Sequence, residues 1–132
     1  MPLALAATLP TGSGRAVLLS GRNDDDLGQW SFVTALPQAT LLVRGTRFEI
    51  VDAAGVCVAL GDRDPCDVIA EFVAAHQWQA DDAGPLPSVV GYLGYEMGAA
   101  LEGVTTLPRG LPDVVLAAYP AVWRWAPHAR EP

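Results

Sequence analysis

Lysine is absent from this sequence, and its eight arginines are outnumbered by fifteen acidic residues, which gives a formal net charge of −7. A field of that sign repels the phosphates of nucleic acids and the surface of anionic membranes. Without lysine, the chain also lacks the residue that contacts phosphate in a P-loop. We therefore expect neither a nucleic acid nor a membrane as a partner.

Cysteine and histidine are scarce. Cys57 and Cys66 are too few and too closely spaced for a disulfide framework or a four-ligand zinc site, and His76 and His128 are the only histidines. Cys57 has no histidine beside it, and Cys66 has no visible partner that would make it a nucleophile. The sequence predicts no metal site, no catalytic residue and a reduced, cytoplasmic protein.

Long apolar runs are missing as well. Residues 1–14 are apolar in part, but they lack a basic n-region and their apolar stretch is too short to span a bilayer. Neither a signal peptide nor a membrane anchor is indicated. We expect residues 1–14 to be a flexible N-terminal segment and residues 15–132 to form one domain.

Short runs of branched and aromatic residues, separated by turn residues, predict an antiparallel meander in the first half of the chain. The expected strands span residues 15–20, 30–36, 40–44, 47–51 and 56–60. Gly45 lies between the third and fourth strands, where a tight hairpin needs a positive φ. Residues 52–55 are expected to form the next turn.

Helical periodicity follows residue 63. Apolar residues and one histidine recur at spacings of three and four: Val68, Ile69, Phe72, Val73 and His76. Asp64 is a suitable N-cap, Pro65 suits the first helical position, and Asp67 lies in the first turn, near the positive end of the helix dipole. We interpret His76, on the apolar face, as a partly buried, hydrogen-bonded core residue rather than a base.

The rest of the chain predicts a loop over residues 80–87 and then a strand that becomes a helix near Gly94 and ends by Gly103. A loop over 106–113 precedes a long final strand over 114–126, which Pro120 must bend. The expected fold class is α+β, mostly an antiparallel sheet or sandwich with two or three helices.

Two stretches resemble known ligand loops without matching them. "NDDDLG" (residues 23–28) lacks the alternating carboxylates and the final glutamate of an EF-type calcium loop, so it is better interpreted as a solvated hairpin loop. The glycines of "GYLGYEMG" (91–98) do not match a phosphate-binding spacing. Close packing at a strand-to-helix corner explains them better, and Glu96 suits the helix dipole there.

Three stretches, taken in order, carry a family resemblance: "AVLLSG" with "GQWSFVTALP" (16–37), "PSVVGYLGYEMGAALE" (87–102) and "LPDVVLAAYPAVWRWA" (111–126). They resemble the N-terminal domain of component I of two chorismate-utilising enzymes, aminodeoxychorismate (para-aminobenzoate) synthase and anthranilate synthase. "GYLGYE" followed by "LPD" is the more specific part. The resemblance covers nearly the whole chain from about residue 15 and implies the N-terminal domain of that fold.

In that family the enzyme transfers ammonia, delivered by a glutamine amidotransferase subunit, onto chorismate with Mg²⁺. The chorismate and Mg²⁺ ligands lie in a larger C-terminal catalytic domain, which this chain lacks. The resemblance therefore implies an isolated domain that is inactive and holds no cofactor. Its implied partners are the catalytic domain and the amidotransferase, and self-association could cover the apolar surface where the catalytic domain packs.

The resemblance also implies a ligand pocket. The family domain supplies one wall of a tryptophan pocket, which is an inhibitor site in anthranilate synthase and a more structural site in some aminodeoxychorismate synthases. Ser20 matches the serine of the family's "LLES" motif, and residues 27–30 match the segment that closes over the ligand. The implied ligand residues are Ser20, Asp26, Leu27, Gly28, Gln29 and Trp30. Asp26 or a strand carbonyl could accept hydrogen bonds from the ammonium group of an amino acid.

Two positions depart from the family pattern. Leu19 stands where anthranilate synthases have the motif's glutamate, and Gln29 replaces the arginine of "GRYSFIG". Losing both charged groups argues against tryptophan feedback and favours the aminodeoxychorismate branch, which leads to 4-aminobenzoate and folate. Two alternatives stay open: an anthranilate synthase component I domain with a tryptophan feedback site, and a free-standing binding or interaction module.

Overall fold

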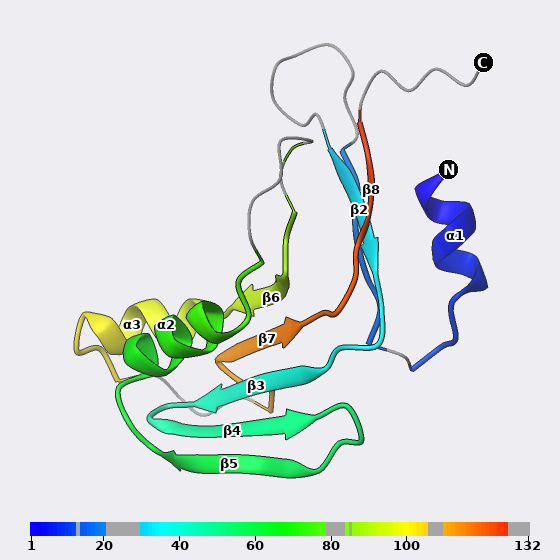
Figure 1. Ribbon diagram of the computed structural model, residues 1–132. Coiled ribbons are helices and arrows are strands. Elements are labelled where there is room, and N and C mark those ends of the chain that lie inside the picture. The colour runs from blue at the N-terminus through cyan, green and yellow to red at the C-terminus, as the bar shows by residue number, and fades with distance from the viewer. Residues whose placement is uncertain (13, 21–29, 79–83, 85, 106–109, 127–132) are drawn as a thin grey trace.

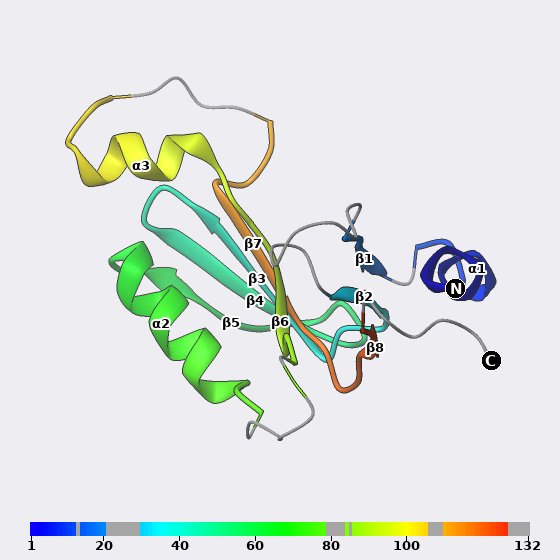
Figure 2. The ribbon, with the colours of Figure 1, turned by 90° about the horizontal axis from the view of Figure 1, so that it is seen from above.

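The computed structural model describes residues 1–12, 14–20, 30–78, 84, 86–105 and 110–126. These residues form three helices and two antiparallel sheets, with strand orders β5-β4-β3-β7-β6 and β1-β2-β8. The three-stranded sheet stands at one end of the five-stranded sheet, and helices α2 and α3 lie toward the other end (Figures 1 and 2). The predicted α+β class is confirmed.

The five-stranded sheet is built around a hairpin meander. Its strands are β3 (Ala39–Arg44), β4 (Arg47–Asp52), β5 (Cys57–Asp62), β6 (Val89–Leu93) and β7 (Val114–Ala118). Gly45 turns the β3–β4 hairpin with a φ of 59°, as predicted. The Asp113 carboxylate accepts a hydrogen bond from the Gly45 amide at 2.6 Å, and the Asp113 amide donates to the Val43 carbonyl at 2.8 Å. The aspartate of "LPD" thus fastens β7 to this turn.

The three-stranded sheet contains β1 (Ala16–Leu18), β2 (Ser31–Thr34) and β8 (Trp123–Trp125). The prediction of one continuous meander was wrong, because β2 pairs with β1 and β8 rather than with β3. Between β2 and β3 the chain turns at Leu36, whose φ is 58°, and Pro37 follows it. This turn directs β3 into the other sheet.

The final stretch also divides between the two sheets. Residues 114–126, predicted as one bent strand, form β7 in the five-stranded sheet and β8 in the three-stranded sheet. Pro120 lies at the crossing, where it has no amide hydrogen to donate to a ladder. The Thr34 hydroxyl, in a side chain only 1% exposed, donates to the Ala121 carbonyl at 2.7 Å and ties β2 to this crossing.

Helix α2 (Pro65–Ala75) covers one face of the five-stranded sheet. The Asp64 side chain accepts a hydrogen bond from the Cys66 amide at 2.8 Å, which confirms the predicted N-cap. The core cluster joins the helix to the sheet: Leu41, Val43, Val68, Phe72, Val114 and Ala118. His76 is half-buried at the C-cap, with its Nδ1 2.8 Å from the Phe72 carbonyl oxygen, so its interpretation as a hydrogen-bonded core residue is confirmed.

Helix α1 (Pro2–Thr8) was not predicted; residues 1–14 were expected to be a flexible segment. Arg15 donates to the Ala6 carbonyl at 2.7 Å and to the Leu9 carbonyl at 3.2 Å, and Ala6 is buried. A helix of seven residues is too short to be stable alone, so its formation depends on docking against β1 and β2. The helix lies beside the three-stranded sheet, away from the five-stranded one (Figures 1 and 2).

Tyr119 joins the N-terminal region to the crossing between the sheets. It is 4% exposed, its hydroxyl donates to the Gly14 carbonyl at 2.6 Å, and burial raises its pKa above 10.0. Replacing it with phenylalanine should lower the free energy of unfolding by about 1 kcal/mol, because the hydrogen bond from the buried tyrosine to the Gly14 carbonyl is lost. Urea unfolding near neutral pH measures this change, and an unchanged midpoint would contradict it.

The same residue predicts an alkaline transition. Because the folded-state pKa of Tyr119 is raised, the unfolded chain loses the phenolic proton first as the pH rises. The contribution of Tyr119 to stability is therefore complete below about pH 10 and is lost as the pH rises toward the folded-state pKa. In Tyr119→Phe this part of the decline in stability should disappear, which unfolding curves from pH 9 to 11 would measure.

Candidate functional site

Two of the predicted pocket residues, Ser20 and Trp30, lie at the end of the three-stranded sheet where β1 ends and β2 begins. Ser20 follows β1 by two residues, and Trp30 directly precedes β2. Asp26, Leu27, Gly28 and Gln29 lie outside the described residues. Of the six predicted ligand residues, the structure therefore describes two, Ser20 and Trp30, at the same end of one sheet.

The Ser20 hydroxyl makes no hydrogen bond to any other described residue. Its backbone amide donates to the Ser31 hydroxyl oxygen at 3.1 Å, which fixes the chain beyond β1. Its own Oγ is buried and has no hydrogen-bond partner in the part of the chain that the structure describes. A buried polar atom left without a partner costs about 1–3 kcal/mol, so native proteins seldom keep one without a reason. This hydroxyl is therefore the group in the described structure best suited to bind a polar ligand atom.

Trp30 is held by contacts from two distant parts of the chain. The guanidinium carbon of Arg124, on β8, lies 5.6 Å from the centroid of the indole ring, within the range of a cation–π interaction. Arg124 also donates from Nη1 to the Gly84 carbonyl at 2.9 Å. Phe32 pairs with Arg124 in the register of β2 and β8, so Trp30, two residues before Phe32, belongs to the same face of the sheet.

Gly84 completes this contact because it has no side chain. Its φ is 117°, and a Cβ built on it would lie 2.7 Å from Cζ2 of Trp30. No other residue type fits there without moving the indole. Ser20, Trp30, Gly84 and Arg124 thus lie toward one end of the three-stranded sheet.

Sequence reasoning missed Gly84 and Arg124. One signal for Arg124 was available: it is the charged residue in the aromatic stretch "WRW", where a cation needs a partner. Gly84 lies in a loop rich in proline and glycine and offered no such signal. Its role follows only from the tertiary contact with Trp30.

The glycines of "GYLGYEMG" are explained by packing, as predicted, at two of three positions. A Cβ on Gly91 would overlap the Val115 carbonyl oxygen, and one on Gly94 would lie 2.9 Å from the Asp113 carbonyl oxygen. A Cβ on Gly98, in α3 (Tyr95–Leu101), would meet no atom within 4 Å, so packing does not explain that glycine. Glu96 lies in the first turn of α3, as predicted.

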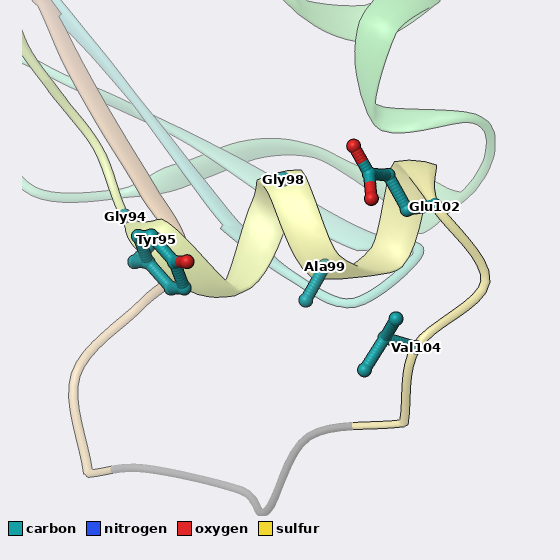
Figure 3. A pocket seen from close by; sticks show the side chains of 6 residues that line it. All are labelled: Gly94, Tyr95, Gly98, Ala99, Glu102 and Val104. Carbon is teal, nitrogen blue, oxygen red and sulfur yellow. The ribbon is translucent and has the colours of Figure 1, made fainter.

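A groove of about 420 Å³ lies along α3 (Figure 3). It is lined by Gly94, Tyr95, Gly98, Ala99, Glu102 and Val104. Among the lining residues that the structure describes, Glu102 is the sole charged group, and Tyr95 is 91% exposed. Within that described lining, no second charged group lies beside the Glu102 carboxylate to form a catalytic pair. The groove also lies at the end of the molecule away from the three-stranded sheet (Figures 1 and 2).

No metal or nucleophile site appears in the part of the chain that the structure describes. No group of three histidine, cysteine, aspartate or glutamate side chains there could hold a metal ion. Cys57 and Cys66 are exposed free thiols. None of the described helices is long and apolar enough to cross a membrane.

The face of the five-stranded sheet opposite α2, which we call the outer face, carries apolar side chains. One cross-strand row runs through all five strands: Leu60, Glu49, Leu42, Val115 and Tyr92. These residues alternate with the core residues that face α2. Leu60 is 65% exposed and Tyr92 is 43% exposed. Four of the five residues in this row are apolar and Glu49 is charged, and a partly exposed, mainly apolar row can mark a surface that another domain covers.

Comparison with known proteins gives a structural match only. A scan against protein-family models and a search of curated proteins each find no match. Sixteen chains of solved structures match, among them anthranilate synthase component I from Streptococcus pneumoniae TIGR4, with 20% sequence identity and a TM-score of 0.56. That match covers 96% of this chain and 27% of the other. The chain thus shares the fold of about a quarter of that protein.

Proposed function

We propose that this chain is the N-terminal domain of a component I subunit of the chorismate-utilising enzymes, of the aminodeoxychorismate synthase type. In the parent enzyme, chorismate would be aminated with Mg²⁺ in a catalytic domain outside this chain. The domain itself would act as a scaffold and supply one wall of a pocket for an aromatic amino acid. The fold match over 96% of the chain supports this proposal, as do the family stretches around residues 16–37 and 87–126.

One observation carries the pocket: the buried Ser20 Oγ has no partner among the described residues. Ser20 is the residue that the family resemblance assigns to the ligand, and Trp30 lies at the same end of the sheet. A hydroxyl can donate to a carboxylate or accept from an ammonium group, so it can bind either polar group of an amino acid. The proposed ligand is L-tryptophan.

The choice between the two enzyme branches rests on Leu19 and Gln29. Leu19 is 51% exposed and replaces the motif's glutamate, so the ammonium group of an amino acid would lose its charged partner there. Gln29 replaces the motif's arginine. We therefore favour the aminodeoxychorismate branch, with anthranilate synthase component I as the second candidate because the matched structure carries that name.

The outer face supports the proposed partners. Its mainly apolar row would be covered by the catalytic domain of the parent chain, and in the isolated chain a second copy could cover it instead. A free-standing interaction module would use the same face for another protein. We also propose that the parent enzyme receives ammonia from a glutamine amidotransferase subunit and is located in the cytoplasm.

Calorimetric titration of the purified chain with L-tryptophan tests the proposed pocket. Binding should be detectable in the wild type and about tenfold weaker in Ser20→Ala, because one hydrogen bond to a charged ligand group contributes about 1.5 kcal/mol. Ser88→Ala is the matched control: Ser88 is also half-buried, and its backbone carbonyl, which the substitution keeps, accepts from the Tyr119 amide at 2.9 Å.

Equal affinity in Ser20→Ala and the wild type would exclude Ser20 as a ligand residue. If neither protein binds tryptophan, the domain is a scaffold alone and the pocket proposal is wrong. Weaker binding in both serine variants would indicate a general loss of stability rather than a contact.

A further inference from the structure

We infer that Arg124 is a positioning residue that holds Trp30 as the aromatic wall beside Ser20. The inference rests on the proposed function, because the wall matters only if a ligand binds at that end of the sheet. Arg124 lies outside the stretch from Ser20 to Trp30 that the family resemblance assigns to the ligand. Its role follows from the contacts among Trp30, Gly84 and Arg124.

Arg124 engages two parts of the chain at once. Its guanidinium carbon lies 5.6 Å from the Trp30 ring centroid, and its Nη1 donates to the Gly84 carbonyl at 2.9 Å. Its side chain is half-buried, so water screens these interactions less than at an exposed site. The arginine therefore links β8 to Trp30, the residue before β2, and to Gly84, five residues before β6.

Gly84, between α2 and β6, packs against the indole of Trp30. Because Gly84 has no side chain, its backbone can pack closely against the ring. A Cβ built on it would lie only 2.7 Å from Cζ2 of Trp30. The hydrogen bond from Arg124 holds that backbone in place. Trp30 thus contacts a backbone it fits closely and a cation that attracts its ring, which restricts the indole to few orientations.

A fixed indole at this position favours ligands with a flat apolar ring. Trp30 would offer an aromatic surface for stacking, while the Ser20 hydroxyl would bind a polar group of the same ligand. If Trp30 could rotate freely, a ligand would have to order it on binding, which lowers affinity. Arg124 would then determine affinity for aromatic amino acids without touching them.

The chain offers a matched control for Arg124. Arg44 also donates from Nη1 to a glycine carbonyl, that of Gly110 at 3.4 Å, but it is exposed and lies at the far end of β3. Arg124→Leu and Arg44→Leu therefore remove the same charge and the same kind of hydrogen bond, and only Arg124→Leu removes the contact with Trp30.

The first test needs no ligand. The chain is labelled with fluorotryptophan, and the Trp30 resonance, one of four, is assigned by its loss in Trp30→Phe. We expect that resonance to shift in Arg124→Leu and to keep its position in Arg44→Leu. Arg124→Lys should also shift it, because an ammonium group cannot lie flat over the indole and donate sideways to Gly84 as a guanidinium does. An unchanged Trp30 resonance in Arg124→Leu would overturn the inference.

The second test measures L-tryptophan affinity in the same variants. Arg124→Leu should bind about fivefold to tenfold more weakly than the wild type, and Arg44→Leu should bind equally well. If the Trp30 resonance shifts but wild type binds no tryptophan, the proposed ligand fails while the positioning of Trp30 stands. If binding is unchanged in Arg124→Leu, Arg124 does not set the affinity and the inference fails.

Discussion

Gly91→Ala should prevent stable folding or lower the free energy of unfolding by about 3 kcal/mol or more. Gly91 lies in β6, where a Cβ would overlap the carbonyl oxygen of Val115 in the neighbouring strand β7. The overlapping atom belongs to the backbone, so no side-chain rotation relieves it. Relief would require β6 to separate from β7, and the corner that leads to α3 would move with it. Urea unfolding followed by circular dichroism measures the loss.

Gly98→Ala is the control for this effect. Gly98 lies within α3, and a Cβ there would meet no atom within 4 Å. Alanine has a higher helix propensity than glycine, so this variant should be more stable by roughly 0.5–1 kcal/mol. Opposite signs at two glycines seven residues apart would show that close packing, rather than a general need for glycine, explains Gly91. A neutral Gly91→Ala would contradict the packing of β6 against β7.

Phe72→Ala should lower the free energy of unfolding by about 3–5 kcal/mol. The ring is 3% exposed and belongs to the cluster that joins α2 to the five-stranded sheet. Removing it leaves a cavity between Val68 and the sheet and also removes the ring contact with His76, at 4.5 Å between centroids. A domain of this size has about 5–15 kcal/mol of stability in total, so the variant should be partly unfolded at 37 °C. Thermal unfolding measures this outcome.

Leu60→Ala is the matched large-to-small change at an exposed position. Leu60 lies in the edge strand β5 and is 65% exposed, so its removal leaves no cavity. The expected loss is below about 0.5 kcal/mol. A loss at Leu60 as large as at Phe72 would contradict the position of the core between α2 and the sheet.

Local patterns in the sequence predicted most elements of the fold. The turn at Gly45 and the capped helix after Asp64 depend on residues within a few positions of each other, and both are found as predicted. The division of the strands between two sheets was not predicted. It depends on where β2 and β8 meet, ninety or more residues apart in sequence, and strand pairing of that kind leaves no local signal.

The candidate site shows the same limit. Ser20 and Trp30 were identified from the family resemblance, and the structure places both at one end of the three-stranded sheet. Gly84 and Arg124 were missed because their roles exist only through contacts with Trp30 from other segments. Helix α1 was missed for a related reason, since its seven residues depend on contacts with β1 and β2.

The central claim is that an aromatic amino acid binds at the Ser20 end of the three-stranded sheet. Titrating L-tryptophan into the isotope-labelled chain and following the backbone amide resonances by NMR tests it most directly. The account predicts saturable shifts at Ser20, Trp30, Ser31, Gly84 and Arg124, with the residues of α3 unchanged. Shifts confined to the groove along α3, or no saturable shift at any tryptophan concentration, would contradict it.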